Sequence, residues 1–208
     1  MAFFFKRLFG KRKTDIQASN DIPTKAERNE IETNRPRKDK AQLDADFHTA
    51  LVLNDSGRSK EAFELMKRTA DAGHKRAQFN TGVFYAQGHG VEQDFGMAVI
   101  YYSMAAMLGD RDANYNLGLL FFLGQGVKQP DLGKAFSYFM TAAQLGDYLG
   151  MAAVSYCYNN GKGVEKDEDE ATKWGQQAMA TPGANVFSIL KVASVLDNPY
   201  PSNITYSE

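Results

Sequence analysis

Apolar residues recur with helical spacing through residues 77–183, in stretches that alternate with short glycine-rich segments. In one stretch Leu117, Leu120 and Phe121 fall at i, i+3 and i+4, which places them on one face of a helix. A glycine-rich segment follows, and Asp131 then stands at the head of the next apolar stretch, where an N-cap is expected. The pattern therefore predicts pairs of helices joined by glycine loops.

This pattern repeats with a period of 36 or 37 residues. At an offset of 36 the matching positions of two copies are Ala77, Gly82, Gly88, Gly90 and Val91 with Ala113, Gly118, Gly124, Gly126 and Val127. One extra residue at Pro130 moves the second half of the unit to an offset of 37, and a third, less complete copy follows. Periods of this length are typical of stacked helical units that bury a core only against their neighbours. The sequence thus predicts a repeat solenoid.

A motif between Ala113 and Asp147 resembles a known repeat family. It reads Ala-x3-Leu-Gly-x2-Phe-x2-Gly-x-Gly-Val and then Asp-x2-Lys-Ala-x2-Tyr-Phe-x2-Ala-Ala-x2-Gly-Asp, which is similar to the Sel-one-like repeat, a relative of the tetratricopeptide repeat. The resemblance implies an all-α fold, a right-handed superhelix of helix pairs. We place one tetratricopeptide-like unit and three Sel-one-like units at residues 43–76, 77–112, 113–149 and 150–183.

The segments outside the repeats differ from them in composition. We divide the chain into a basic, phenylalanine-rich arm, a flexible charged linker, the repeat solenoid, a cap helix and a proline-containing tail, at residues 1–13, 14–40, 41–183, 184–197 and 198–208. A solenoid exposes its last repeat unless another element covers it. The apolar side expected to provide this cover consists of Val186, Ile189, Leu190, Ala193 and Leu196.

The resemblance also implies a binding surface, because the first helices of such repeats line a concave groove that binds peptides or proteins. The groove positions carried over to this chain are Phe47, Leu51, Asn54, Phe79, Val83, Gln87, Tyr115, Leu119, Phe122, Tyr156 and Asn159. Asn80 and Asn116 share the following register, and their amides are candidates to hold a partner's backbone. The alternative is that the apolar members of this set simply pack between repeats.

The N-terminal arm has the composition of a peripheral membrane anchor. Residues 1–40 hold 11 of the 24 Lys/Arg and 6 of the 25 Asp/Glu, so a basic segment precedes an acidic body. On a short helix, apolar and cationic side chains would face an anionic membrane surface. The predicted membrane contacts are Phe4, Phe5, Lys6, Arg7, Leu8, Phe9, Lys11, Arg12 and Lys13. The alternative is an unstructured arm that docks on a partner or contacts nothing.

Composition and residue spacing argue against several other functions. A formal charge of -1 does not favour nucleic-acid binding, and one cysteine, Cys157, allows no internal disulfide. His48, His74 and His89 share no metal-ligand spacing and are expected at the surface. Three glycine triplets of the form Gly-x-Gly recur with the period and are expected to be structural turns rather than a phosphate site; they are Gly88-His89-Gly90, Gly124-Gln125-Gly126 and Gly161-Lys162-Gly163. We therefore expect no cofactor, no metal and no small-molecule substrate.

Two functional interpretations remain from the sequence. The first is a non-enzymatic adaptor in the cytoplasm that binds a protein or peptide partner in its groove, with the arm holding it at the inner face of a membrane. The second is an inhibitor or immunity-type regulator that caps a partner enzyme. An enzyme is disfavoured because no convergent acid, base and nucleophile can be named.

Overall fold

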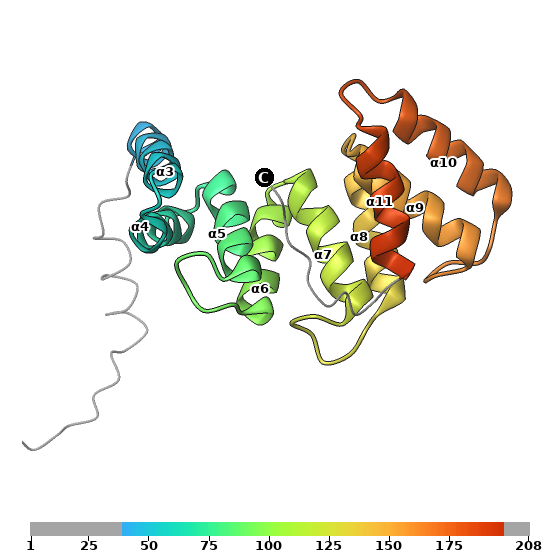
Figure 1. Cartoon of the computed structure of the whole chain (residues 1–208), viewed down its shortest axis with the longest axis horizontal. Coiled ribbons are helices and arrows are strands. Elements are labelled where there is room, and N and C mark those ends of the chain that lie inside the picture. Colours follow the sequence, from blue (N-terminus) through green and yellow to red (C-terminus); the bar gives the residue numbers. More distant parts are fainter. Residues whose placement is uncertain (1–38, 198–208) are drawn as a thin grey trace, which may run out of the picture. The chain divides into compact units, whose positions relative to one another are not determined.

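The computed structural model describes residues 39–197, and this range contains nine α-helices and no strand (Figure 1). The helices are α3 (Lys40–Asp55), α4 (Ser59–Asp71), α5 (Lys75–Gln87), α6 (Phe95–Met107), α7 (Arg111–Leu123), α8 (Leu132–Gln144), α9 (Tyr148–Asn160), α10 (Glu168–Ala180) and α11 (Val186–Asp197). The predicted all-α class is confirmed. The predicted arm and tail, and nearly all of the predicted linker, lie outside the described residues.

Four helical hairpins follow one another along the described chain. They pair α3 with α4, α5 with α6, α7 with α8 and α9 with α10, and each hairpin packs on the next through α4 and α5, α6 and α7, or α8 and α9 (Figure 1). We call α3, α5, α7 and α9 the first helices, and α4, α6, α8 and α10 the second helices. The buried side chains form two clusters that run through consecutive hairpins, as the predicted solenoid requires.

Aspartate caps most of these helices at the expected places. Asp131, for example, accepts a hydrogen bond from the Lys134 backbone N–H at 3.0 Å. Helix α5 differs, because His74 Nδ1 accepts the capping bond from the Ala77 N–H at 3.0 Å while the His74 ring stacks on Phe47. The expectation that His74 is a surface residue is therefore wrong, since the ring is half-buried between α3 and α5.

Small residues let the two helices of a hairpin approach closely. A Cβ built on Gly82 would lie 2.6 Å from the Tyr102 ring, and one built on Gly118 would clash with the Phe139 ring. The last hairpin reverses this arrangement, since Gly175 occupies the aromatic position and faces Ser155. Ser155 Oγ donates to the Ala171 carbonyl at 2.6 Å. The departure of Ser155 from the repeat pattern is thus matched by Gly175 across the hairpin.

The glycine triplets lie in the loops between the two helices of a hairpin, and each loop packs on the preceding hairpin. The middle of each loop contains a glycine with φ between 68° and 73°, a conformation that favours glycine. A Cβ on any of them would clash with a backbone carbonyl at the start of the preceding second helix, for Gly90 that of Ser59, for Gly126 that of Phe95 and for Gly163 that of Leu132. The triplets therefore serve as backbone contacts between repeats.

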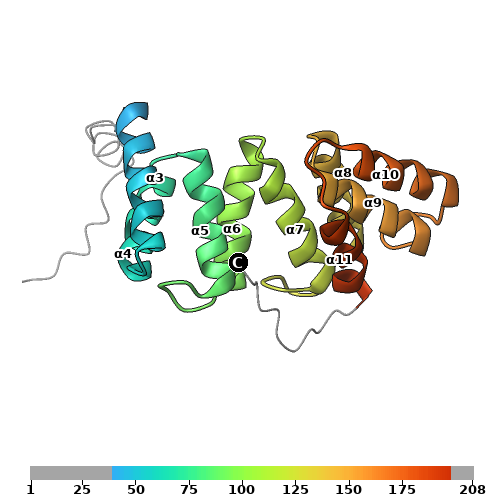
Figure 2. The same cartoon turned by 45° about the horizontal axis from the view of Figure 1, so that its top comes forward.

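Helix α11 covers more than the open end of the solenoid. It packs against α9 and also touches α7 and α10, so it lies across the first-helix side (Figure 2). Its buried side chains are Val192 and Leu196. The predicted apolar side is wrong in part, because Val186 and Leu190 are 54% and 63% exposed. The buried side is centred on Val192 and Leu196, and Val186 and Leu190 lie outside it.

Candidate functional site

A pocket of about 320 Å³ opens on the first-helix side, between α5, α7 and α11. This volume lies at the lower end of the range of ligand pockets in proteins. The predicted groove residues that line it are Phe79, Val83, Gln87, Tyr115, Asn116 and Leu119. The structure thus brings together six of the thirteen predicted residues at one concave site, and their role in binding stays a prediction.

The floor and sides of the pocket are mostly apolar. The rings of Phe79 and Tyr102 lie 5.7 Å apart at an angle of 35°, and the Tyr115 ring lies 5.9 Å from Phe139. Leu120 and Leu123 of α7 add aliphatic surface. Because the rings of Phe79, Tyr102 and Tyr115 are each packed against another ring, these walls are held in place before any ligand binds.

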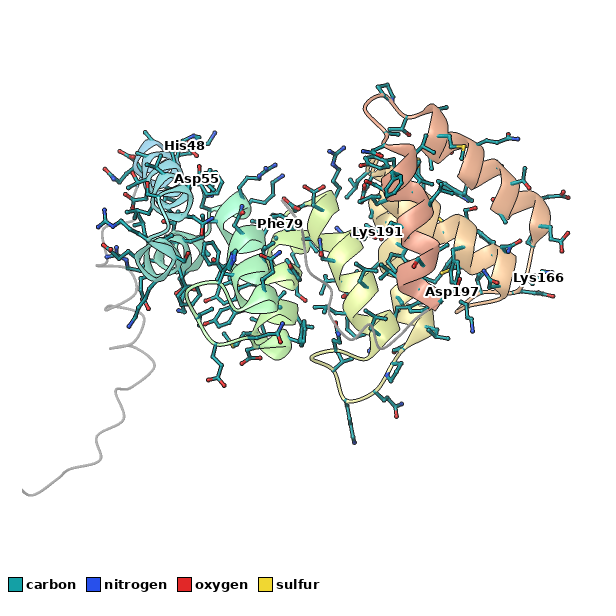
Figure 3. All side chains as sticks on the ribbon, viewed as in Figure 1. His48, Asp55, Phe79, Lys166, Lys191 and Asp197 are labelled. Carbon is teal, nitrogen blue, oxygen red and sulfur yellow. The ribbon has the colours of Figure 1, made fainter. Side chains whose placement is uncertain are left out.

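Helix α11 supplies the remaining wall. Val192 and Val195 contribute apolar surface, while Ser188 and Lys191 contribute polar groups. Figure 3 shows Phe79 on α5 and Lys191 on α11, with α7 between them in this view. The pocket is therefore a composite of repeat helices and the helix that follows the repeats.

The amide side chains of Asn116, Gln87 and Gln125 line the pocket, whereas that of Asn80 does not, and these amides differ in availability. Asn116 Nδ2 donates to the Asp112 carbonyl at 2.8 Å, and Asn80 Nδ2 donates in the same way to Arg76 at 2.8 Å. One amide N–H of each residue expected to hold a partner's backbone is thus used within its own helix. Gln87 and Gln125, by contrast, line the pocket without a side-chain hydrogen bond to any described residue.

Two of the predicted aromatic groove residues are part of the core instead. Phe47 is 9% exposed, because its ring stacks on His74 at 4.8 Å. Phe122 is 7% exposed, because its ring contacts both Phe139 and Tyr156. For these two positions the structure favours the alternative reading of the sequence, in which apolar residues pack between helices.

The other predicted positions outside the pocket have varied surroundings. Leu51 packs against the core cluster, Asn54 is half-buried, and Asn159 is exposed on α9. Tyr156 lies under α11, where its hydroxyl donates to Asp197 Oδ1 at 2.5 Å. Burial and this hydrogen bond raise the pKa of Tyr156 above its ordinary value. The chain's own α11 thus occupies the part of the first-helix side that Tyr156 was expected to offer to a partner.

The sequence analysis missed every pocket residue outside the first helices. These are Phe95, Tyr102, Gln125, Ser188, Lys191, Val192 and Val195. The position of the second-helix aromatic could have been found, since Tyr102 repeats as Phe139 one unit later. The α11 residues could not, because their contribution depends on where α11 folds back.

Groups that could support chemistry are few in the described part of the chain. Cys157 is buried, and burial raises the pKa of its thiol to about 12, so the nucleophilic thiolate is not populated at neutral pH. Between residues 39 and 197 no three His, Cys, Asp or Glu side chains are placed to hold a metal ion. None of the helices in that range is long and apolar enough to cross a bilayer.

Comparison with known proteins identifies the repeats. The family model of the Sel1 repeat matches residues 59–74, 75–110, 111–147 and 149–179, which is more than half of the chain. The chain is 31% identical over 121 residues to the chitin synthase regulator SKT5 of Saccharomyces cerevisiae, covering 57% of this chain and 17% of that protein. It is 33% identical over 117 residues to HRD3B of Arabidopsis thaliana, an ERAD-associated E3 ubiquitin-protein ligase component, covering 56% and 18%. The chain thus spans less than a fifth of the length of either of these two relatives.

Solved structures agree with this assignment. A protective antigen of uropathogenic Escherichia coli with an SLR fold, c5321, aligns with a TM-score of 0.66 and 27% identity, over 77% of this chain and 33% of that one. A Sel1 repeat protein from Oxalobacter formigenes aligns with a TM-score of 0.62 and 26% identity, over 75% and 72%. The predicted solenoid fold is confirmed.

Proposed function

This chain belongs to the Sel1 repeat family, and on that premise we propose that it is an adaptor that binds a peptide segment of a partner protein in the pocket between α5, α7 and α11. The names of its relatives, a chitin synthase regulator and a ubiquitin-ligase component, describe proteins that act on or within assemblies. The observation that carries the proposal is the pocket itself, since six predicted groove residues line it.

The chemistry of the pocket supports a peptide as the ligand. Its aromatic walls offer contact area at a small cost in side-chain entropy. Gln87 and Gln125 offer amide donors and acceptors that no described side chain or backbone group uses, which suits the backbone of an extended segment. The lining residues include no carboxylate, histidine or thiol, so the proposed role is binding without catalysis.

A selection experiment tests the pocket as the binding site. The full chain is used to select binders from a random peptide library, and selected peptides are titrated against Leu119→Arg and against Ser137→Arg. Leu119 lines the pocket, while Ser137 is exposed on α8. We expect Leu119→Arg to weaken binding by about tenfold or more, which equals roughly 1.4 kcal/mol, and Ser137→Arg to leave it unchanged. Equal binding to all three proteins would refute the pocket.

We further propose that the arm at residues 1–13, outside the described residues, holds the adaptor at the inner face of an anionic membrane. Its five cations contribute about 1 kcal/mol each near such a surface, and Phe4, Phe5, Leu8 and Phe9 add apolar contacts. Co-sedimentation with phosphatidylserine-containing and purely phosphatidylcholine vesicles tests this. Binding that is the same for the full chain and for a chain without residues 1–13 would exclude the arm as the anchor.

A regulator that caps a partner enzyme is the second candidate, and it is favoured by the similarity to a protein named as a chitin synthase regulator. Such a regulator would use the same pocket. The two candidates differ in outcome, because an adaptor leaves the turnover of its bound partner unchanged. Measuring the partner enzyme's activity with wild type and with Leu119→Arg therefore separates them.

A further inference from the structure

The charges at the pocket are unbalanced. Its lining residues include one cation, Lys191, and no carboxylate. Four other lysines in the described chain pair with carboxylates, namely Lys67, Lys134, Lys166 and Lys173. Lys191 forms no ion pair with any residue in the range 39–197. Among the described residues, the positive charge of Lys191 at the edge of the apolar pocket thus has no carboxylate partner.

The position of Lys191 suits recognition of an anion next to an apolar group. Its side chain is exposed, and its methylene groups can line the pocket while the ammonium stays in water. Ser188 lies three residues earlier on the same face of α11 and also lines the pocket. Its hydroxyl is a second donor beside the ammonium, so one carboxylate can contact both.

We propose that the pocket selects peptides in which an aromatic or branched aliphatic side chain lies within about three residues of an Asp or Glu, because an extended chain spans only about 3.3–3.6 Å per residue. The apolar side chain enters between Phe79, Tyr115 and Leu119, and the carboxylate pairs with Lys191. This inference rests on the proposed function, and it specifies in addition that the bound peptide carries a negative charge. It also gives α11 a role in specificity, since α11 carries the cation.

A charge-reversal selection tests the inference. Peptides are selected from the same library with wild type, with Lys191→Glu and with Lys60→Glu, which is an exposed lysine on α4 that does not line the pocket. Wild type and Lys60→Glu are expected to enrich acidic residues near the apolar one. Lys191→Glu is expected to enrich Lys or Arg at that place. Hydrogen exchange across α11 verifies that α11 stays docked in the variant.

Synthetic peptides then measure how much the ion pair with Lys191 contributes to affinity. They also show whether the carboxylate belongs to a side chain or to the peptide's C-terminus. A selected peptide is compared with its Glu-to-Gln version, and each is made with a free and with an amidated C-terminus. Loss of the side-chain charge should weaken binding to wild type about two- to fivefold, as expected for an exposed ion pair, and the effect should shrink at high salt. Binding that depends on the free C-terminus instead would overturn the side-chain assignment.

The failure of this inference is distinguishable from the failure of the pocket. If wild type, Lys191→Glu and Lys60→Glu enrich the same charges while Leu119→Arg still weakens binding, the pocket is the site and Lys191 does not select its ligand. If Leu119→Arg weakens the binding of no selected peptide, or if the selection enriches no peptide, both proposals are wrong. The inference is supported if the Gln version of the peptide binds wild type and Lys191→Gln equally well, and if the Glu version binds Lys191→Gln more weakly than it binds wild type.

Discussion

The ring of Phe139 lies directly over the backbone of Gly118, so close that any side chain on Gly118 would overlap Cδ1 and Cε1 of the ring. Phe139 is itself fully buried. The glycine is therefore required by the aromatic residue across the hairpin rather than by its own backbone conformation, because it lies within helix α7. Glycine inside a helix is otherwise unfavourable by about 1 kcal/mol relative to alanine.

Gly118→Ala is expected to destabilise the protein by about 1–3 kcal/mol, because the added methyl group must displace the Phe139 ring in a tightly packed core. Urea denaturation measures the free energy of unfolding. Gly133→Ala is the matched control, since a Cβ there meets only Asp131 Oδ1 at 3.7 Å and should stabilise α8 by a few tenths to about 1 kcal/mol. If both substitutions changed the free energy of unfolding in the same direction, the packing explanation would be contradicted.

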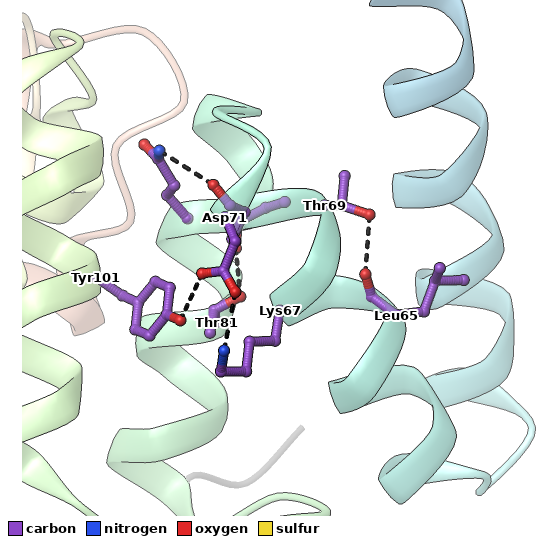
Figure 4. Close-up of polar contacts among 9 residues, drawn as sticks. Leu65, Lys67, Thr69, Asp71, Thr81 and Tyr101 are labelled. Carbon is purple, nitrogen blue, oxygen red and sulfur yellow. Dashed lines mark hydrogen bonds and ion pairs between the residues drawn. The ribbon is translucent and has the colours of Figure 1, made fainter. Parts of the chain in front are cut away.

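A polar contact between hairpins gives a second prediction. The Tyr101 hydroxyl donates to Asp71 Oδ1 at 2.7 Å, and Lys67 Nζ lies 2.8 Å from Asp71 Oδ2 (Figure 4). Tyr101→Phe removes the donor, and we expect a loss of about 1 kcal/mol in the free energy of unfolding. Asp71→Ala removes the acceptor together with the Lys67 partner, and it should cost about 1 kcal/mol less in Tyr101→Phe than in wild type, whereas additive costs would show that the two residues do not act together.

The same tyrosine predicts a loss of stability in alkali. Burial, helped by the hydrogen bond to Asp71, raises the pKa of Tyr101 to about 12 from its ordinary value of 10. Between these two values the folded chain keeps a proton that the unfolded chain has lost, so stability falls as the pH rises through this window. Denaturation at several alkaline pH values should show a steeper decline for wild type than for Tyr101→Phe.

The raised pKa of Asp147 predicts an effect of acidic pH on the free energy of unfolding. Burial raises the pKa of this carboxyl, against the opposing hydrogen bond from the Leu149 N–H at 3.1 Å. A raised folded-state pKa contributes stability that is full below the unfolded value and is lost as the pH rises through the folded value. Asp147→Asn keeps an oxygen for the cap but cannot ionise. Wild type should therefore lose stability relative to Asp147→Asn as the pH rises from acid.

The test is urea denaturation of both proteins across the acidic range. Asp131→Asn at the N-cap of α8 controls for the general effect of exchanging a capping carboxylate for an amide. Parallel pH profiles for wild type and Asp147→Asn would contradict the assignment to Asp147.

The docking of α11 depends on Leu196. This side chain is 3% exposed against α9, whereas Leu190 on the same helix is 63% exposed. Truncating a buried leucine costs about 2–5 kcal/mol, which is large for a single helix held by few buried residues. Leu196→Ala should therefore accelerate amide exchange throughout α11 while α5 to α8 stay protected, and Leu190→Ala should not. Full protection of α11 in Leu196→Ala would contradict this account.

Much of the fold could be predicted because the same sequence signals recur in several repeats. Asp131 marks the start of its helix, and the conserved spacing of glycines and apolar residues marks the loops and the buried side of each helix. The replacement of aspartate by His74 at an N-cap was not predicted, because histidine is an uncommon capping residue and its ring is oriented by Phe47 and Asp44.

The candidate site was only partly predictable. Periodicity places Phe79, Tyr115 and Leu119 on one side of the first helices, but it does not separate residues that line a cavity from residues such as Phe122 that fill the core. That difference arises from the packing of neighbouring rings. Lys191 was beyond sequence reasoning, since its place at the pocket depends on how α11 folds back across α9 and α7.

The glycine contacts between hairpins explain where this protein can change its length. Gly126 rests on the backbone at the start of α6, and the chain rejoins the repeat pattern at the bond from the Asp131 N–H to the Phe121 carbonyl at 2.9 Å. The extra residue at Pro130 lies between these two fixed points. A single extra residue between Gly126 and Asp131 thus leaves both contacts in place, whereas an added hairpin would bring its own copy of the glycine contact.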